Sequence, residues 1–467
     1  MPHSPPETSP PVPLDIAVIG SGIAGLSAAW LLSKSHRVTL YEKEDRPGGH
    51  ANTVEADGAG PVDTGFIVYN EPCYPNLVAL FDHLGVATRA ADMSFSASLD
   101  GGRVEYAGSS LATLFAQKRN LLRPRFWRML SDLLRFYREA PGLLAELQQG
   151  PAAETLTLGD VLDRGGYSDA FVRDHLLPMA AAIWSTPARS MRDHPAAAFI
   201  RFCDNHGLLR IKGRPVWRTV EGGSRSYVDR ILADMPGALR LNCAVEGIVR
   251  EEGRVLVRDR RGAVRAHDHA VIATHADQAL ALLEDAGEDE RRLLGAFGYE
   301  RNLAILHSDA SLMPKRRAVW SSWNYLAEQE SDGQGNGGQD AVCVSYWMNR
   351  LQGFLPRERD LFVTLNPLRQ PRDGSILRSV LYDHPIFGME ALAAQKQLWS
   401  LQGQRRTWFA GSYFGAGFHE DGAQAGLAVA EALGGLRRPW TVPNPSGRIH
   451  VGPAPVPDAR AAALEAV

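Results

Sequence analysis

The residues of this chain that most clearly specify chemistry are three glycines, Gly20, Gly22 and Gly25, in the segment 15–42, DIAVIGSGIAGLSAAWLLSKSHRVTLYE. In such a segment the first glycine permits a tight turn, the second lets backbone N–H groups reach a pyrophosphate, and the third lets helix and strand pack closely. The helix that follows opens with Ile23 and Ala24, and its N-terminus carries partial positive charge. The spacing therefore predicts a dinucleotide-binding turn in preference to a purely structural one.

An acidic residue, Glu42, closes the second strand of this segment, and Lys43 follows it. A carboxylate at this position hydrogen-bonds a ribose 2′-hydroxyl, whereas a 2′-phosphate would meet its negative charge. The sequence therefore disfavours NADP and leaves FAD and NAD as candidate dinucleotides, with Lys43 among the contacting residues.

A second glycine-rich segment lies at residues 45–50, DRPGGH, and a third at residues 63–66, DTGF. Both resemble the RxGGR and D-x-G elements of the superfamily of flavin amine oxidases, protoporphyrinogen oxidases and phytoene desaturases, and this resemblance selects FAD. His50 stands where the family usually has arginine, so it either contacts phosphate or is a surface histidine at a turn. The resemblance implies cofactor contacts from Arg46, Gly48, Gly49, His50, Thr64, Gly65 and Phe66.

Three later segments extend the FAD site by the same resemblance. Gly222 and Gly223 precede a predicted helix at residues 225–234 and match the family's second glycine pair beneath the flavin, although Gly-Gly-Ser is also an ordinary helix N-cap. A predicted strand pair at 241–249 and 254–258 contains Val245, whose backbone is expected to contact the adenine. A further strand begins at residue 269, and Thr274, which follows it, is an expected cofactor contact.

A C-terminal segment, residues 408–426, resembles the family's flavin-binding signature, with a serine where relatives usually carry an acid. Within it, Asp421 and Gln424 have capping-box spacing, which predicts a first helical turn with unpaired N–H groups just after Asp421. Those donors would stabilise negative charge at N1 and C2=O of the reduced flavin by about 1–2 kcal/mol. The expected contacts are Gly411, Ser412, Asp421, Gly422 and Ala423.

Candidate catalytic residues follow from the expected reaction, in which a C–H bond gives hydride to flavin N5 and a base takes a proton. His419 and Glu420 begin the helix of the flavin segment and are the first candidates for the base, with His384 behind them. An amine oxidase would instead place an aromatic pair at N5, for which Tyr413 and Phe418 are available. It would also use the relatives' water-bridging lysine, which no lysine of this sequence matches in context.

Composition limits the other possibilities. The chain has 467 residues, 45% of them hydrophobic, and a net charge of −3, which supports at least two domains and gives no sign of nucleic-acid binding. Four separated cysteines predict free thiols in a reducing cytoplasm and no metal site. The family's cysteine attachment point for FAD lies nearer the C-terminus and no cysteine follows Cys343, so the resemblance implies non-covalent FAD. The sequence predicts no membrane-spanning segment, and residues 1–13 are expected to be a disordered, Pro-rich leader.

The order of the segments predicts an α/β fold, with a Rossmann-like FAD-binding domain of the glutathione-reductase and amine-oxidase type and an inserted α+β substrate domain. The FAD-binding domain is expected at residues 14–90, 215–290 and 403–437, the substrate domain at 91–214 and 291–402, a disordered loop at 328–340, and a peripheral Pro-rich tail at 438–467. Six aromatic residues of the substrate domain are candidates to line an apolar tunnel: Trp184, Trp320, Trp323, Tyr325, Tyr346 and Trp347.

One further stretch, Gln117–Leu144, mixes seven Lys and Arg residues with Leu, Phe, Trp and Tyr. This composition is typical of a basic amphipathic helix on an anionic membrane, and also of a solvated helix packed on its own domain. Between residues 14 and 436, through motifs such as 345–349 and 417–422, the chain resembles a bacterial clade whose relatives include desaturases of methyl-branched phospholipid acyl chains. That resemblance implies a lipid substrate and a peripheral position on the inner membrane face. A flavin amine oxidase and a flavin-dependent isomerase are the alternatives, and the electron acceptor stays open.

Overall fold

The computed structural model describes residues 13–149, 156–184, 190–328 and 343–453. All but the last residue of the predicted leader, and nearly all of the predicted loop at 328–340, lie outside these ranges. Within them, no helix is long and apolar enough to cross a membrane.

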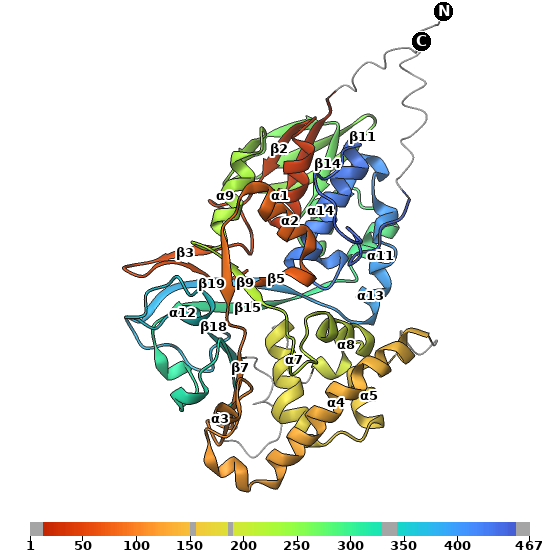
Figure 1. Ribbon diagram of the computed structural model, residues 1–467. Coiled ribbons are helices and arrows are strands. Elements are labelled where there is room, and N and C mark those ends of the chain that lie inside the picture. The colour runs from red at the N-terminus through yellow and green to blue at the C-terminus, as the bar shows by residue number, and fades with distance from the viewer. Residues whose placement is uncertain (1–12, 150–155, 185–189, 329–342, 454–467) are drawn as a thin grey trace, which may run out of the picture.

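A five-stranded parallel sheet carries the first glycine-rich turn (Figure 1). Its order is β10 (Ala238–Arg240), β2 (Arg37–Tyr41), β1 (Asp15–Ile19), β14 (His269–Ile272) and β20 (Thr407–Phe409). The central strand β1 is buried from Ile16 to Ile19, as a strand paired on both edges requires. This is the predicted Rossmann-like arrangement.

Two helices pack tightly against one another beside this sheet, α1 (Ile23–Leu32) and α14 (His419–Gly434). A Cβ at Gly426 would lie 2.1 Å from the Ala24 carbonyl oxygen, so the close approach of the helices requires glycine there. A Cβ at Gly422 would lie 2.8 Å from Cγ2 of Ile23. The first turns of the two helices are therefore side by side, although the chain enters them almost 400 residues apart.

A seven-stranded mixed sheet forms the second large layer (Figure 1). Its order is β19 (Ile376–Ile386), β15 (Gly298–His307), β18 (Phe362–Leu365), β17 (Cys343–Trp347), β16 (Trp323–Leu326), β7 (Phe95–Leu99) and β8 (Val104–Ala107). Its strands come from both predicted insertions. The first insertion lies between β2 and β10 of the parallel sheet, and the second lies between β14 and β20.

Three smaller antiparallel sheets complete the fold. They are β3 (Thr53–Ala56) with β4 (Gly60–Asp63), β5 (Tyr69–Asn70) with β9 (Trp217–Val220) and β6 (Thr88–Ala91), and β11 (Val245–Glu251) with β12 (Arg254–Asp259) and β13 (Val264–His267). The antiparallel pairing of β11 with β12 confirms the strand pair that the sequence predicts.

The remaining helices cover the layers. They are α2 (Pro75–Leu84), α3 (Leu111–Leu114), α4 (Pro124–Gln149), α5 (Leu158–Arg164), α6 (Asp169–Phe171), α7 (Leu177–Trp184), α8 (Ala196–Asn205), α9 (Arg225–Ala233), α10 (Ala276–Leu282), α11 (Glu288–Leu294), α12 (Met348–Leu351) and α13 (Met389–Gln395). The basic stretch at 117–144 becomes a short 3₁₀ helix, Lys118–Leu122, followed by most of α4.

Part of the C-terminal tail, which the sequence predicts to be peripheral, packs against the protein core through Trp440, Arg448 and Ile449. The Arg448 guanidinium lies 2.7 Å from the fully buried carboxylate of Asp421 and also donates to the Cys73 carbonyl. Trp440 stacks on Trp30, with ring centroids 5.6 Å apart. The tail folds back because a buried carboxylate in α14 needs a cation.

We predict that Arg448→Ala lowers the free energy of unfolding by about 3–5 kcal/mol, because it leaves the buried Asp421 carboxylate without its ion pair. Chemical denaturation followed by circular dichroism measures the loss. Arg437→Ala is the control, since Arg437 is exposed on the same segment. Equal stability of the two variants would contradict the structural role of the tail.

Candidate functional site

A cavity of about 2360 Å³ lies between the parallel sheet and the seven-stranded sheet. Cavities for a single small ligand usually measure about 300–1,000 Å³. The lining residues come from both layers, from the glycine turn at Gly20 to Trp323 and Tyr346 of the seven-stranded sheet. The cavity therefore has room for a dinucleotide and a second molecule.

One end of the cavity is a cradle made by two glycine turns. The N-cap of α1 is Gly22, which has no side-chain cap, so the first N–H groups of the helix are available to an anion. A Cβ at Gly22 would meet nothing within 4 Å, whereas a Cβ at Gly49 would lie 3.0 Å from the Gly22 Cα atom. The turns thus touch each other and leave open space beside Gly22, which fits a pyrophosphate.

Gly20 and Gly25 set the backbone geometry of this turn. Gly20 has a φ of +96°, and a Cβ at Gly25 would lie 1.8 Å from the Gly20 carbonyl oxygen. Ile23 and Ala24, at the start of α1, line the cavity.

The cradle continues to an acidic end at the tip of β2. A Glu42 carboxylate oxygen accepts from the Ser21 N–H at 3.0 Å, and the other accepts from the Glu44 N–H at 2.9 Å. Glu42, Lys43 and Val245 all line the cavity. A carboxylate held in this way could accept a hydrogen bond from a ribose hydroxyl, the contact that the sequence predicts.

The RxGGR-like segment supports the cradle from the other side. The Arg46 guanidinium donates to the Gly49 carbonyl at 3.0 Å and thereby braces the turn that it precedes. Gly48 does not line the cavity; its N–H donates to the Ser21 carbonyl, which ties the two turns together. His50 lines the cavity and is not a surface residue.

A buried carboxylate, Asp63, holds the third segment in place. It accepts from Thr53 Oγ1, from the N–H and Oγ of Ser224, and from Gln352 Nε2, at 2.6–3.0 Å. Burial raises the pKa of Asp63 to about 6. Sequence reasoning placed the following residues, Thr64, Gly65 and Phe66, at the site, and they do line the cavity. The sequence did not predict the role of Asp63, because its partners Thr53, Ser224 and Gln352 lie far from one another along the chain.

The second glycine pair differs from its prediction. Gly222 and Gly223 do not line the cavity, and a Cβ at Gly223 would lie 2.5 Å from Cγ2 of Thr53. Ser224 is not a side-chain N-cap either, since its hydroxyl donates to Asp63. These glycines, both with positive φ, let the start of α9 approach Asp63.

The flavin-signature helix begins one turn earlier than predicted. Its N-cap is Phe418, whose N–H donates to the Asp421 carboxylate at 2.8 Å, and the Gly422 N–H already donates to the Phe418 carbonyl. The amides of Gly422 and Ala423 are therefore not unpaired, and neither these residues nor Asp421 line the cavity. The free first-turn N–H groups belong to His419, Glu420 and Asp421 instead.

Glu420 does not lie in the cavity, which contradicts its predicted role as a base. Its carboxylate accepts from the N–H groups of Asn76 and Leu77 and from the side chains of Asn76 and Gln424, at 2.8–3.1 Å. Burial raises its pKa. The carboxylate binds the N-terminus of α2 to α14 and is structural.

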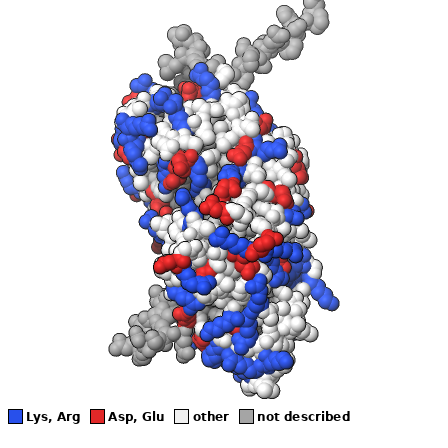
Figure 2. Space-filling view, turned by 90° about the vertical axis from the view of Figure 1, so that its left-hand side faces the viewer, with Lys and Arg blue, Asp and Glu red and all other residues white. Residues whose placement is uncertain are grey.

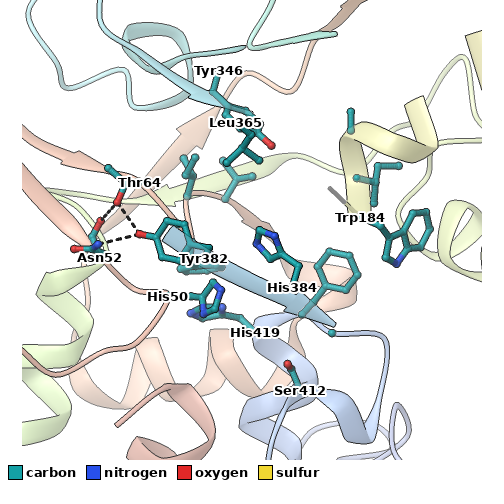
Figure 3. A pocket seen from close by; sticks show the side chains of 18 of the residues that line it. His50, Asn52, Thr64, Trp184, Tyr346, Leu365, Tyr382, His384, Ser412 and His419 are labelled. Atoms are coloured by element: carbon teal, nitrogen blue, oxygen red, sulfur yellow. Dashed lines mark hydrogen bonds between the residues drawn. The ribbon is translucent and has the colours of Figure 1, made fainter. Parts of the chain in front are cut away.

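Histidines gather in the cavity beside Tyr382, as Figure 3 shows for His50, His384 and His419. The His50 ring centroid lies 4.9 Å from that of Tyr382 and 5.6 Å from that of His384. Desolvation lowers the pKa of His384 to about 4 and that of His419 to about 3, and lowers that of His50 as well. All three imidazoles are therefore neutral at pH 7.

The sequence did not predict a hydrogen-bond network that surrounds Tyr382. The Tyr382 hydroxyl accepts from Asn52 Nδ2 at 2.9 Å and lies 2.8 Å from Thr64 Oγ1 (Figure 3). Only the position of Asn52, two residues after the RxGGR-like segment, gave a signal for it. The network fixes the wall between the cradle and the rest of the cavity.

The sequence offers Tyr413 and Phe418 as an aromatic pair for an amine oxidase, and the two side chains pack on different neighbours. Tyr413 packs on Phe297 and Phe414, whereas Phe418 stacks on Phe202, although Tyr413 and Phe418 both line the cavity. Gly411, Ser412 and Thr274 also line it.

Three of the six aromatic residues named as candidates for an apolar tunnel line the cavity. Trp184, Trp323 and Tyr346 line the cavity, whereas Trp320 and Trp347 pack around Phe362 and Tyr325 lies in the core. Figure 3 shows Trp184 on α7, away from the histidines.

Comparison with known proteins agrees with this geometry. The family model for flavin containing amine oxidoreductases matches residues 23–433. The chain belongs to this family. FAD is its cofactor, and the cradle of glycine turns, Glu42 and Val245 fits that dinucleotide.

Curated relatives of the chain include two kinds of flavoenzyme. A putative flavin-containing monoamine oxidase AofH of Mycobacterium tuberculosis is 26% identical over 270 residues, 56% of this chain and 56% of that protein. A phytoene dehydrogenase of Streptomyces griseus is 47% identical over 62 residues, 13% of this chain and 12% of that protein. The chain thus spans about half the length, or less, of the curated relatives it matches.

Solved structures share the fold. A CLA-producing fatty acid isomerase from P. acnes gives a TM-score of 0.63 at 16% identity, over 88% of this chain and 97% of that one. A variant of putrescine oxidase gives 0.64 at 16% identity, over 90% and 98%.

We predict that Gly22→Val abolishes FAD binding without unfolding the protein, because the new side chain enters open space that the pyrophosphate needs and the Gly22 φ of −64° suits any residue. Acid precipitation releases non-covalently bound FAD into the supernatant, and the amount of FAD found there measures the occupancy of the site. Gly25→Val is the contrasting variant, since its Cβ collides with the Gly20 carbonyl and should prevent folding. Full occupancy in Gly22→Val would refute the cradle.

Proposed function

We propose that this protein is an FAD-dependent oxidoreductase that dehydrogenates a long apolar chain, such as a fatty acyl chain of a lipid. The observation that carries the proposal is the second arm of the cavity, which runs from the histidines toward α4 and is almost free of charge. Its walls are apolar and aromatic, including Phe95, Leu130, Met179, Trp184 and Phe202. Such a surface binds an alkyl chain through the hydrophobic effect.

The carboxylates of the cavity argue against a cationic amine as substrate. Acidic side chains line it at residues 42–57 and at Glu246, on the cofactor side, and Asp383 on the other side pairs with Arg301 at 3.0 Å. Among the described lining residues the one lysine is Lys43, beside Glu42. The apolar arm therefore offers an ammonium group no counter-charge.

FAD, when bound, supplies the hydride acceptor. The protein's own groups must take up the proton and exclude water. His384 Nδ1 accepts from the Asn302 amide at 2.9 Å, so its Nε2 carries the proton and can only donate. His419 stacks on Phe66 at 3.6 Å and lies 3.1 Å from the Tyr227 hydroxyl. If Tyr227 accepts this bond, Nδ1 of the neutral His419 has a free lone pair, which makes His419 the candidate base.

The names of similar proteins support an apolar substrate in part. They include a phytoene dehydrogenase and a fatty acid isomerase, but also amine oxidases. An isomerase that returns the hydride to its substrate is the second candidate, because the same cavity would serve it.

Anaerobic mixing of the FAD-loaded protein with substrates separates these functions. We expect a detergent-solubilised phospholipid with methyl-branched acyl chains to bleach the visible flavin absorption band, and putrescine or cyclohexylamine to leave it unchanged. Bleaching by amines alone would contradict the proposal. A product isomeric with the substrate, with no acceptor consumed, would identify an isomerase.

We predict that His419→Asn lowers turnover by about 100-fold or more while FAD stays bound, because general acid–base groups typically contribute at least that factor. His384→Asn should lose much less, since asparagine keeps an N–H donor. Steady-state turnover and FAD occupancy are the measurements. Unchanged turnover in His419→Asn would exclude this histidine as the base.

A further inference from the structure

The apolar arm of the cavity reaches the surface between α3, the first half of α4 and the loop 208–214. Four side chains there both line the cavity and are exposed: Leu111 by 76%, Trp127 by 48%, Leu134 by 51% and Ile211 by 66%. Trp127 and Leu134 lie seven residues apart, on one face of α4. The opposite face of α4, with Phe126, Met129 and Phe136, is buried in the protein.

The apolar surface continues past the mouth onto the 3₁₀ helix before α4. Leu121 is 47% exposed and Leu122 is 87% exposed, the highest exposed fraction among the large apolar side chains of the described residues. Single exposed apolar residues are common, but several around one opening mark an interaction surface.

Cations outnumber acids around this tip, and the one acid among residues 118–134, Asp132, accepts from the Ser168 N–H and pairs with Arg135. Residues 108–131 contain five Lys and Arg and no Asp or Glu, and residues 205–217 contain three and none. Figure 2 shows Lys and Arg gathered around an uncharged tip at the foot of the molecule, where Figure 1 places α3 and the start of α4.

Not all of these cations are available to a partner. Arg125 pairs with Asp169 and Asp174, and Arg123 donates to the Arg103 carbonyl and Asn120. The side chains of Lys118, Arg128 and Lys212 are exposed and make no hydrogen bond or ion pair within the part of the chain that the structure describes.

We propose that this tip, formed by α3, residues 118–134 and the loop 208–214, docks on a bilayer containing anionic phospholipid. The inference rests on the proposed function, because it supplies the route by which an acyl chain enters the arm without crossing water. Leu122 and Leu121 enter the interfacial region, Trp127 lies at its boundary, and the free cations face the headgroups. Their positive charge is the reason to prefer an anionic bilayer to a neutral surface.

Sedimentation with vesicles of equal parts phosphatidylglycerol and phosphatidylcholine tests the docking with the FAD-loaded protein. We expect binding that weakens as salt is raised and is much weaker to pure phosphatidylcholine. Leu122→Ser should weaken binding about tenfold or more, and Lys118→Ser or Arg128→Ser about fivefold each. Val264→Ser is the matched control, because Val264 is 55% exposed on β13, away from the tip.

Flavin bleaching by a detergent-solubilised acyl substrate separates this inference from the proposed function. Leu122, Lys118 and Arg128 do not line the cavity, so their variants should bleach as the wild type does. Wild-type bleaching without vesicle binding, equal binding of Val264→Ser and Leu122→Ser, or binding only to a soluble acidic carrier protein would overturn the docking alone. Vesicle binding without bleaching by any acyl substrate would overturn the proposed function and leave the docking in place.

Discussion

The site depends on one buried carboxylate, Asp63, which binds three parts of the chain that are distant in sequence. It accepts hydrogen bonds from β3 through Thr53, from the start of α9 through Ser224, and from α12 through Gln352. An unpaired carboxylate in this position would cost several kcal/mol, so the three elements must meet for the fold to be stable. Because Thr64, Gly65 and Phe66 follow Asp63 directly, the same constraint places the wall of the cavity.

The cavity has two halves with opposite chemistry. The cofactor half is built from backbone, with two glycine turns in contact and an uncapped helix N-terminus beside open space. The other half is built from apolar side chains that several distant segments contribute. Neutral histidines and the Tyr382 network lie between them, where desolvation keeps the imidazoles uncharged. This junction is where a C–H bond of a chain in the apolar half would meet the redox cofactor.

The sequence predicted those parts of the structure that are encoded locally. The strand, turn and helix at residues 15–42, the acid at Glu42 and the pairing of β11 with β12 depend on short-range spacing and were recognised. The roles of Glu420, Gly223 and Arg448 were not, because each is decided by a partner far along the chain: Asn76, Thr53 and Asp421. The start of α14 was placed one turn late because Asp421 serves as an internal acceptor at the third helical position and not as the cap itself.

The central claim is that one continuous cavity holds FAD and an alkyl chain end to end. A crystal structure of the FAD-loaded protein with a long-chain fatty acid tests it most directly. The account predicts the dinucleotide along Gly22 and Glu42, and the alkyl chain running from the histidines past Trp184 toward Trp127. A chain bound elsewhere on the protein, or a flavin ring that fills the apolar arm, would contradict it.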